Sequence, residues 1–280
     1  MDQISLPGGD NANEDLIASW HKDGITDIVI LDGGTSVADR AYVDEVNGDA
    51  AWMVGQFARA LEVHAAPGRA QDASLILALK DVHAAFLERT QGIDVPLHAW
   101  PVGAMSWVRI REDRKLGAYC IGDCELLLRH ADGRIEHLNY WVNPQEAVLR
   151  DAVAQLTAAG ITDGAERKKA LLPMLRARRE WMNTTDVPPA LCIAPGGTFV
   201  ARSAALQIES GAMLLGMTDG FYRLVENYGL YTDDGLFDLC SRGGLAEAGR
   251  ILRAHENALA SGAALAVKNA DDASAFSFQF

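Results

Sequence analysis

The sequence lacks the features that mark membrane and secreted proteins. Among its 280 residues, no apolar run approaches the ~20 residues that a membrane-spanning helix needs. The longest apolar stretch, 258–267, is short and is interrupted by polar and glycine residues. Met1 is followed by Asp2 and Gln3 rather than by a basic and then an apolar segment, which predicts no secretory signal. We therefore expect a soluble cytoplasmic protein with no membrane partner.

Cysteine and basic residues are both scarce. The four cysteines, Cys120, Cys124, Cys192 and Cys240, do not follow the spacing of a zinc site, and we expect reduced, mostly buried thiols. Lys and Arg number 25 against 38 Asp and Glu, which gives a net charge of -13. Such a chain lacks the basic face that a nucleic-acid backbone requires, so nucleic acid is not expected as a partner.

The hydrophobic content of 49% allows a sizeable core, and its periodicity indicates the elements. Residues 15–31 alternate around Asp23-Gly24 and predict a hairpin, whose apolar run 28–31 is typical of a strand buried on both faces. Apolar stripes at 53–61 and 75–86 predict two helices.

Further along the chain, strands are predicted at 106–111, 116–121, 125–130 and 134–138, a helical segment at 144–182, a loop with one short strand at 183–202, a strand at 213–217, a helix through 245–252 and a final strand at 276–280. Within the helical segment, Pro173 is expected to kink or restart the helix. Runs of strands interrupted by paired helices favour a layered α+β protein with mostly antiparallel sheets.

Acidic residues stand at the ends of several predicted strands, in Asn13-Glu14-Asp15, Asp32-Gly33, Gly122-Asp123, Asp219-Gly220 and Asp271-Asp272. A single aspartate at a strand end is common in turns and is weak evidence alone. Carboxylates gathered at one sheet edge repel one another and raise one another's pKa unless cations neutralise them. An all-oxygen set favours Mg²⁺ or Mn²⁺ over zinc, and two such ions about 3.5–4 Å apart can bridge and activate a water for phosphoryl chemistry.

Four short segments carry these acidic residues in a definite order. The first is Asn13-Glu14-Asp15 with the hairpin that leads to Asp32-Gly33-Gly34, and the others are Ile121-Gly122-Asp123-Cys124, residues 214–221 around Asp219-Gly220, and Asp271-Asp272-Ala273-Ser274. They resemble, in the same order and over nearly the whole chain, the amino-terminal, Gly-Asp-Ser, Ser-Asp-Gly and Asp-Asn-x-Thr motifs of bacterial PPM-type (type 2C) metal-dependent Ser/Thr protein phosphatases.

The resemblance implies one PPM-type phosphatase-like domain over 1–280, folded as a four-layer α-β-β-α sandwich of two mostly antiparallel sheets flanked by helix pairs. The segment at about 144–182 takes the place of the variable flap beside the active site. The implied activity is hydrolysis of phosphoserine and phosphothreonine esters, in signalling, by a water that bridges two Mn²⁺ or Mg²⁺ ions. The alternatives are a small-molecule phosphomonoesterase on the same fold and a non-catalytic, phosphoprotein-binding pseudophosphatase.

The resemblance also implies a role for individual residues. The positions carried over to the metal site are Asp32, Gly33, Asp219, Asp271 and, for a weaker third ion, Asp123. Asp32 would bridge both principal ions and Gly33 would bind through its carbonyl. For Asp123, stabilisation of a turn is an equal alternative. Glu14 and Asp15 would orient metal-bound waters, so the implied catalytic set is Asp32, Asp219, Glu14 and Asp15.

The sequence departs from the family at the phosphate-binding residue. Four residues before the motif glutamate the family usually has an arginine, whereas this chain has Asp10, which repels phosphate. Arg40, close to the metal loop, is the candidate replacement, with a solvated arginine at a helix start as its alternative. The helical segment also carries a basic cluster that is either a solvated face or a docking surface for acidic or phosphorylated partners: Arg167, Lys168, Lys169, Arg176, Arg178 and Arg179.

Overall fold

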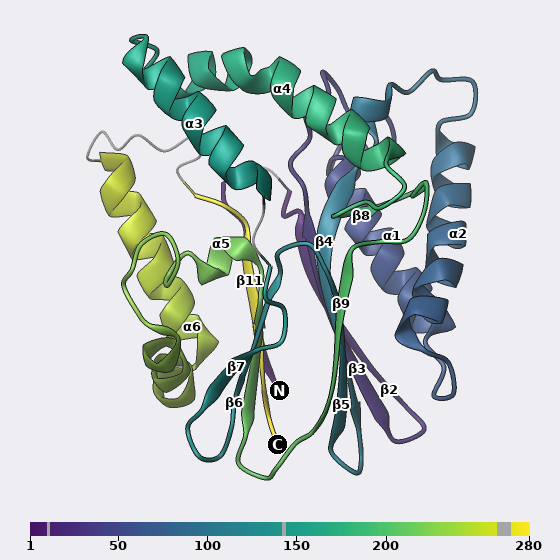
Figure 1. Cartoon of the computed structure of the whole chain (residues 1–280), viewed down its shortest axis with the longest axis vertical. Coiled ribbons are helices and arrows are strands. Elements are labelled where there is room, and N and C mark those ends of the chain that lie inside the picture. The colour runs from purple at the N-terminus through teal and green to yellow at the C-terminus, as the bar shows by residue number, and fades with distance from the viewer. Residues whose placement is uncertain (10–11, 142–143, 262–269) are drawn as a thin grey trace.

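Two antiparallel sheets lie face to face at the centre of the protein, and helices cover their outer faces (Figure 1). The computed structural model describes residues 1–9, 12–141, 144–261 and 270–280. One sheet has the strand order β1-β11-β10-β6-β7, and the other has the order β2-β3-β4-β5-β9, with β8 paired to β4. This arrangement is the four-layer α-β-β-α sandwich that the family resemblance implied, and it agrees with the layered α+β class that the sequence pattern predicted.

The first sheet is built from β1 (Asp2–Leu6), β6 (Glu125–Arg129), β7 (Ile135–His137), β10 (Met213–Met217) and β11 (Ala273–Gln279). The second is built from β2 (Asp15–Lys22), β3 (Ile25–Gly33), β4 (Val102–Arg111), β5 (Lys115–Ile121), β8 (Leu191–Cys192) and β9 (Ala201–Gln207). The helices are α1 (Asp49–His64), α2 (Gln71–Arg89), the 3-10 turn η1 (Leu97–Ala99), α3 (Pro144–Ala158), α4 (Gly164–Thr184), α5 (Asp219–Tyr222) and α6 (Asp233–Ser261).

Strand β3 shows why the layers form. Its side chains alternate, so that Val29 and Leu31 join the core beneath α1 and α2, whereas Ile28 and Ile30 join the core between the two sheets. All four are fully buried, as the unbroken apolar run predicted. The predicted hairpin is therefore confirmed, and it supplies apolar surface to both neighbouring layers.

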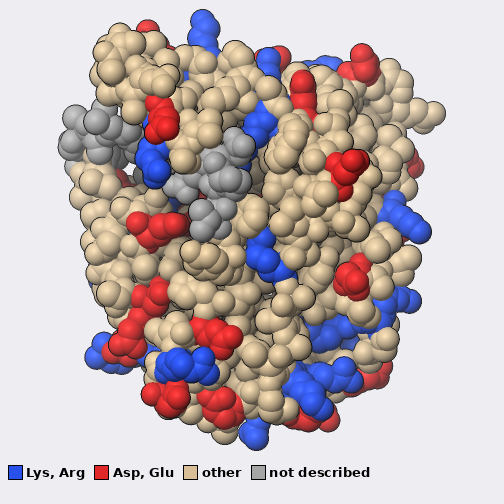
Figure 2. Space-filling view, in the orientation of Figure 1, with Lys and Arg blue, Asp and Glu red and all other residues tan. Residues whose placement is uncertain are grey.

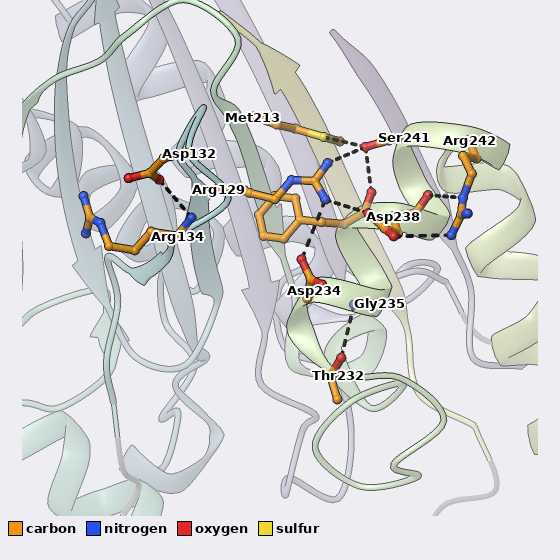
Figure 3. A network of polar contacts seen from close by, with 11 residues as sticks. Arg129, Asp132, Arg134, Met213, Thr232, Asp234, Gly235, Asp238, Ser241 and Arg242 are labelled. Atoms are coloured by element: carbon orange, nitrogen blue, oxygen red, sulfur yellow. Dashed lines mark hydrogen bonds and ion pairs between the residues drawn. The ribbon is translucent and has the colours of Figure 1, made fainter.

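Helix α6 is held against the first sheet by a polar contact as well as by apolar packing (Figure 3). Arg129 of β6 donates from Nη1 to Asp238 at 2.9 Å and from Nη2 to Ser241 at 2.9 Å. Its guanidinium also lies over the ring of Phe237, 5.0 Å from the ring centroid. This side chain spans the gap between strand and helix on the side of the sheet away from the second sheet.

Several details differ from the sequence predictions. Strands β1 and β9 were not predicted, because neither has a strong apolar alternation, and both are edge strands that depend on their neighbours. Helix α4 continues through Pro173 without a restart. The four cysteines are reduced and buried, as predicted.

The described segments contain no helix with the length and apolar character of a membrane span. Helices α3 and α4 lie across one end of the sandwich, over the ends of both sheets (Figure 1). Figure 2 shows Lys and Arg interspersed with Asp and Glu on the visible, coloured surface rather than gathered into one basic face.

Candidate active site

The hairpin brings three of the predicted acidic residues together. In the antiparallel register of β2 and β3, Asp15 lies opposite Asp32. The next residue, Gly33, donates its N–H to the carbonyl of Glu14 at 3.0 Å. Because the register is set by the buried alternation of the hairpin, Glu14 and Asp15 must lie beside Asp32 at this end of the sheet.

The first sheet contributes Asp219 and Asp271, which lie in segments that are neighbours in space. Asp219 follows β10, and Asp271 precedes β11, its antiparallel partner. At Gly220, an added Cβ would lie 1.9 Å from the carbonyl oxygen of Asp272. Only glycine allows this close approach, which places the turn after β10 directly against the segment before β11.

A buried threonine connects the two sheets below these residues. The hydroxyl of Thr218 donates to Oδ2 of Asp15 at 2.8 Å and accepts from the N–H of Ser274 at 3.0 Å. Asp272 holds the amino-terminal segment, because its carboxylate accepts from the N–H of Gly8 at 2.6 Å and from that of Glu14 at 2.7 Å. These bonds fix the position of one sheet's acidic segments relative to the other's.

The acidic segments line one pocket of about 320 Å³ at the end of the sandwich beneath α4. Every residue carried over to the metal and catalytic site lines it: Glu14, Asp15, Asp32, Gly33, Asp123, Asp219 and Asp271. Arg40 does not line it, and its guanidinium instead lies over the ring of Tyr42, 4.7 Å from the centroid. Asp10 lies outside the described residues.

Burial and crowding raise the pKa values of several of the carboxyls that line the pocket. Burial, followed by the charges of Asp219 and Asp15, raises the pKa of Asp32 well above its ordinary value of 3.8. Burial raises the pKa of Asp15 to about 7 although the hydroxyl of Thr218 opposes the shift. Burial and Asp219 raise the pKa of Asp123 to about 6. Asp32 and Asp219 remain accessible from the pocket, so water or an ion can reach both.

This donor set fits a hard divalent cation in its chemistry. Seven carboxylates and two guanidinium groups line the pocket, so negative charge is in excess. The neighbouring negative charges help to raise the pKa of Asp15, Asp32, Asp123 and Asp219. Oxygen ligands of this kind suit Mg²⁺ and Mn²⁺. Among the described residues, however, no three Asp, Glu, His or Cys side chains already stand in the arrangement that holds one ion.

No protein-family model matches this chain, and no curated protein matches it. Among solved structures, the S. agalactiae serine/threonine phosphatase is 14% identical with a TM-score of 0.57, covering 100% of this chain and 98% of that one. The PPM Ser-Thr phosphatase MsPP from Mycobacterium smegmatis, in complex with cacodylate, is 13% identical with a TM-score of 0.53, covering 99% and 97%. This chain has the PPM phosphatase fold.

A further structure with the PPM phosphatase fold is the catalytic domain of PstP, solved with two manganese ions. It is 16% identical with a TM-score of 0.52, and the match covers 98% of this chain and 94% of that one. Similarity at these low sequence identities establishes the fold alone, so the chemistry of this protein is inferred from the residues of its own site.

The site of this PPM-fold protein also contains arginines that the sequence did not assign to it. Arg178 and Arg179 of α4 line the pocket. Arg223 forms an ion pair with Asp271 at 2.8 Å. Arg202 donates to the carbonyl of Gly122 and so supports the turn that carries Asp123. The only sequence signal for any of these was the basic cluster on the helical segment.

That basic cluster is not a uniformly solvated helix face. Arg167 and Arg179 are buried, with 2% and 7% of their surfaces exposed, whereas Lys168 and Lys169 are exposed. The cluster therefore divides into residues that pack against the rest of the protein and residues that face solvent.

Proposed function

We propose that this protein is a metal-dependent phosphatase that hydrolyses phosphoserine and phosphothreonine monoesters. The observation that carries the proposal is the convergence of acidic segments from both sheets on one pocket, in a chain with the PPM phosphatase fold. A carboxylate-lined pocket repels a phosphate dianion unless cations are bound, so the site is useful for phosphoester chemistry only as a metal site.

In this proposal, the ligands of two Mn²⁺ or Mg²⁺ ions are Asp32, Asp219, Asp271 and the carbonyl of Gly33. Asp123 would serve a third, weaker site. When bound, such ions lower the pKa of a water and neutralise the charge that develops on a transferring phosphoryl group.

In this proposal, side chains of the protein orient the attacking water. Asp15 is buried, and its carboxylate is held by the hydroxyl of Thr218 at 2.8 Å. The Glu14 carboxylate accepts from the hydroxyl of Thr35 at 3.2 Å. Both carboxylates therefore present acceptor oxygens in fixed directions beside Asp32, and such acceptors align a water for attack.

The rim of the pocket supports a phosphoprotein rather than a small metabolite as substrate. Trp141 and Trp181 both line the pocket, and 48% of the surface of Trp181 is exposed to solvent. Exposed aromatic side chains contribute strongly to peptide and protein contacts, so the rim can bind residues that flank a phosphorylated side chain. The reduced, buried cysteines suit a cytoplasmic, signalling phosphatase.

The test is hydrolysis of p-nitrophenyl phosphate with Mn²⁺ or Mg²⁺, with and without excess chelator, by the parent chain and by Asp32→Asn. We expect chelation to abolish activity and Asp32→Asn to lower kcat/KM by about 100-fold or more, since even an outer partner of a metal ligand is typically worth about 10–100-fold. Asp94→Asn, on an exposed carboxylate away from the pocket, is the matched control.

Full activity in excess chelator contradicts metal dependence, and unchanged turnover by Asp32→Asn contradicts the assignment of the site. A panel of phosphoserine and phosphothreonine peptides against phosphorylated sugars and nucleotides then decides the substrate class. Higher kcat/KM for the sugars or nucleotides would assign the pocket to small-molecule hydrolysis.

A further inference from the structure

The carboxyl-terminal half of α4 is fastened to the loop that follows Asp32. Arg176 donates from Nε to the carbonyl of Val37 at 2.8 Å and forms an ion pair with Asp39. Arg179 donates from Nη2 to the carbonyl of Thr35 at 3.1 Å. These two arginines, one helical turn apart, hold the helix at a fixed position beside the acidic pocket.

Arg178 projects from the same helical turn in a different direction. Successive helical residues are rotated by about 100°, so the contacts of Arg176 and Arg179 with the loop leave Arg178 on the pocket side. It lines the same pocket as Asp123 and the other carboxylates. Its guanidinium is therefore a cation placed among the carboxylates.

The two arginines that line the pocket in the described part of the chain differ in access. Arg179 is 7% exposed and is directed at backbone carbonyls, whereas Arg178 is only partly buried. A guanidinium that is accessible from the pocket can offer parallel N–H groups to two oxygens of a phosphoryl group.

We infer that Arg178 of α4 is the phosphate-binding arginine of this protein and contacts the phosphoryl group of the bound monoester. The phosphate contact is then supplied by the helical segment inserted between β7 and β8 rather than by the amino-terminal segment. The inference rests on the proposed function for the identity of the ester, but phosphate binding can be measured without turnover.

The experiment is a titration of the Mn²⁺-loaded protein with inorganic phosphate, followed by the change in total tryptophan fluorescence, to which Trp141 and Trp181 at the pocket contribute. The variants are Arg178→Ala and Arg178→Lys. Lys169→Ala, an exposed cation on the same helix, is the matched control. Circular dichroism melts of all variants establish that they are folded.

We expect Arg178→Ala to raise the Kd for phosphate about ten-fold or more, because a charge-assisted hydrogen bond is worth about 1.5–3 kcal/mol. Arg178→Lys should lie between parent and alanine variant, since lysine retains the charge but not the fork of donors. Lys169→Ala should bind phosphate as the parent does. The KM for p-nitrophenyl phosphate should rise in parallel with the Kd.

Equal phosphate affinity in the parent and a folded Arg178→Ala overturns the inference, as does a parent chain that binds no phosphate. If Arg178→Ala unfolds, the comparison of parent with Arg178→Lys decides, and equal affinities in that pair overturn the inference as well. A parent that binds phosphate through Arg178 but hydrolyses no ester sustains the inference and contradicts the proposed function.

Discussion

Replacing Asp15 by asparagine should make the metal-free protein more stable, in a way that depends on pH. In the unfolded chain this carboxyl has its ordinary pKa of 3.8, whereas in the folded protein its pKa is about 7. Between these values the folded state binds more protons than the unfolded state, so the free energy of unfolding falls as pH rises through this window. At about 1.4 kcal/mol per pKa unit, ionised Asp15 lowers the free energy of unfolding by about 1–2 kcal/mol at about pH 5 and by about 4 kcal/mol at about pH 8.

Asp15→Asn removes the ionisation but keeps an oxygen that can accept the hydrogen bond from Thr218. Urea unfolding in chelator should therefore show a higher free energy of unfolding for the variant than for the parent, and this difference should grow from about pH 5 to about pH 8. Asp94→Asn should show no such difference from the parent. Added Mn²⁺ should stabilise the parent more than the variant, because a cation relieves the repulsion that asparagine has already removed. If the variant and the parent have the same free energy of unfolding, or differ by the same amount at both pH values, the reasoning is refuted.

Two further predictions concern a buried ion pair and a close backbone contact. Arg109→Met should lower the free energy of unfolding, measured in urea, by about 3–5 kcal/mol, because Asp27, its partner at 2.9 Å, stays buried without a cation. A loss below about 1 kcal/mol would contradict this prediction. Gly220→Ala should lower Mn²⁺-dependent turnover by about ten-fold or more, because its methyl group would meet the carbonyl of Asp272 and displace the acidic turns. Gly164→Ala, where nothing lies within 4 Å, is the control, and equal turnover in both variants would show that the close approach at Gly220 does not matter.

The part of the site that the β2–β3 hairpin carries could largely be predicted from the sequence, because it depends on residues that are neighbours along the chain. The alternation of the hairpin sets the register, and the register places Asp15 opposite Asp32. The glycines beside Asp32 and Asp219 mark the points at which the strands end and turn. The periodicity of a segment indicates the strand, and the turn residues beside it indicate the end of that strand at which a carboxylate lies.

Other features depend on contacts between distant segments. Strand β1 exists because it pairs with β11 at the other end of the chain, and its five residues carry little signal alone. Strand β9 likewise forms along β5, far from it in the sequence.

The sequence by itself determined the hairpin, the order of the acidic turns and the type of layered fold, since these follow from local periodicity and turn residues. Only the tertiary structure decided that Arg178 and Arg179 line the pocket, about 145 residues after the loop that Arg179 contacts. In the sequence these arginines belong to a basic helix with no indicated partner. A periodic pattern shows which face of an element is buried, but what covers that face depends on how all the elements pack together.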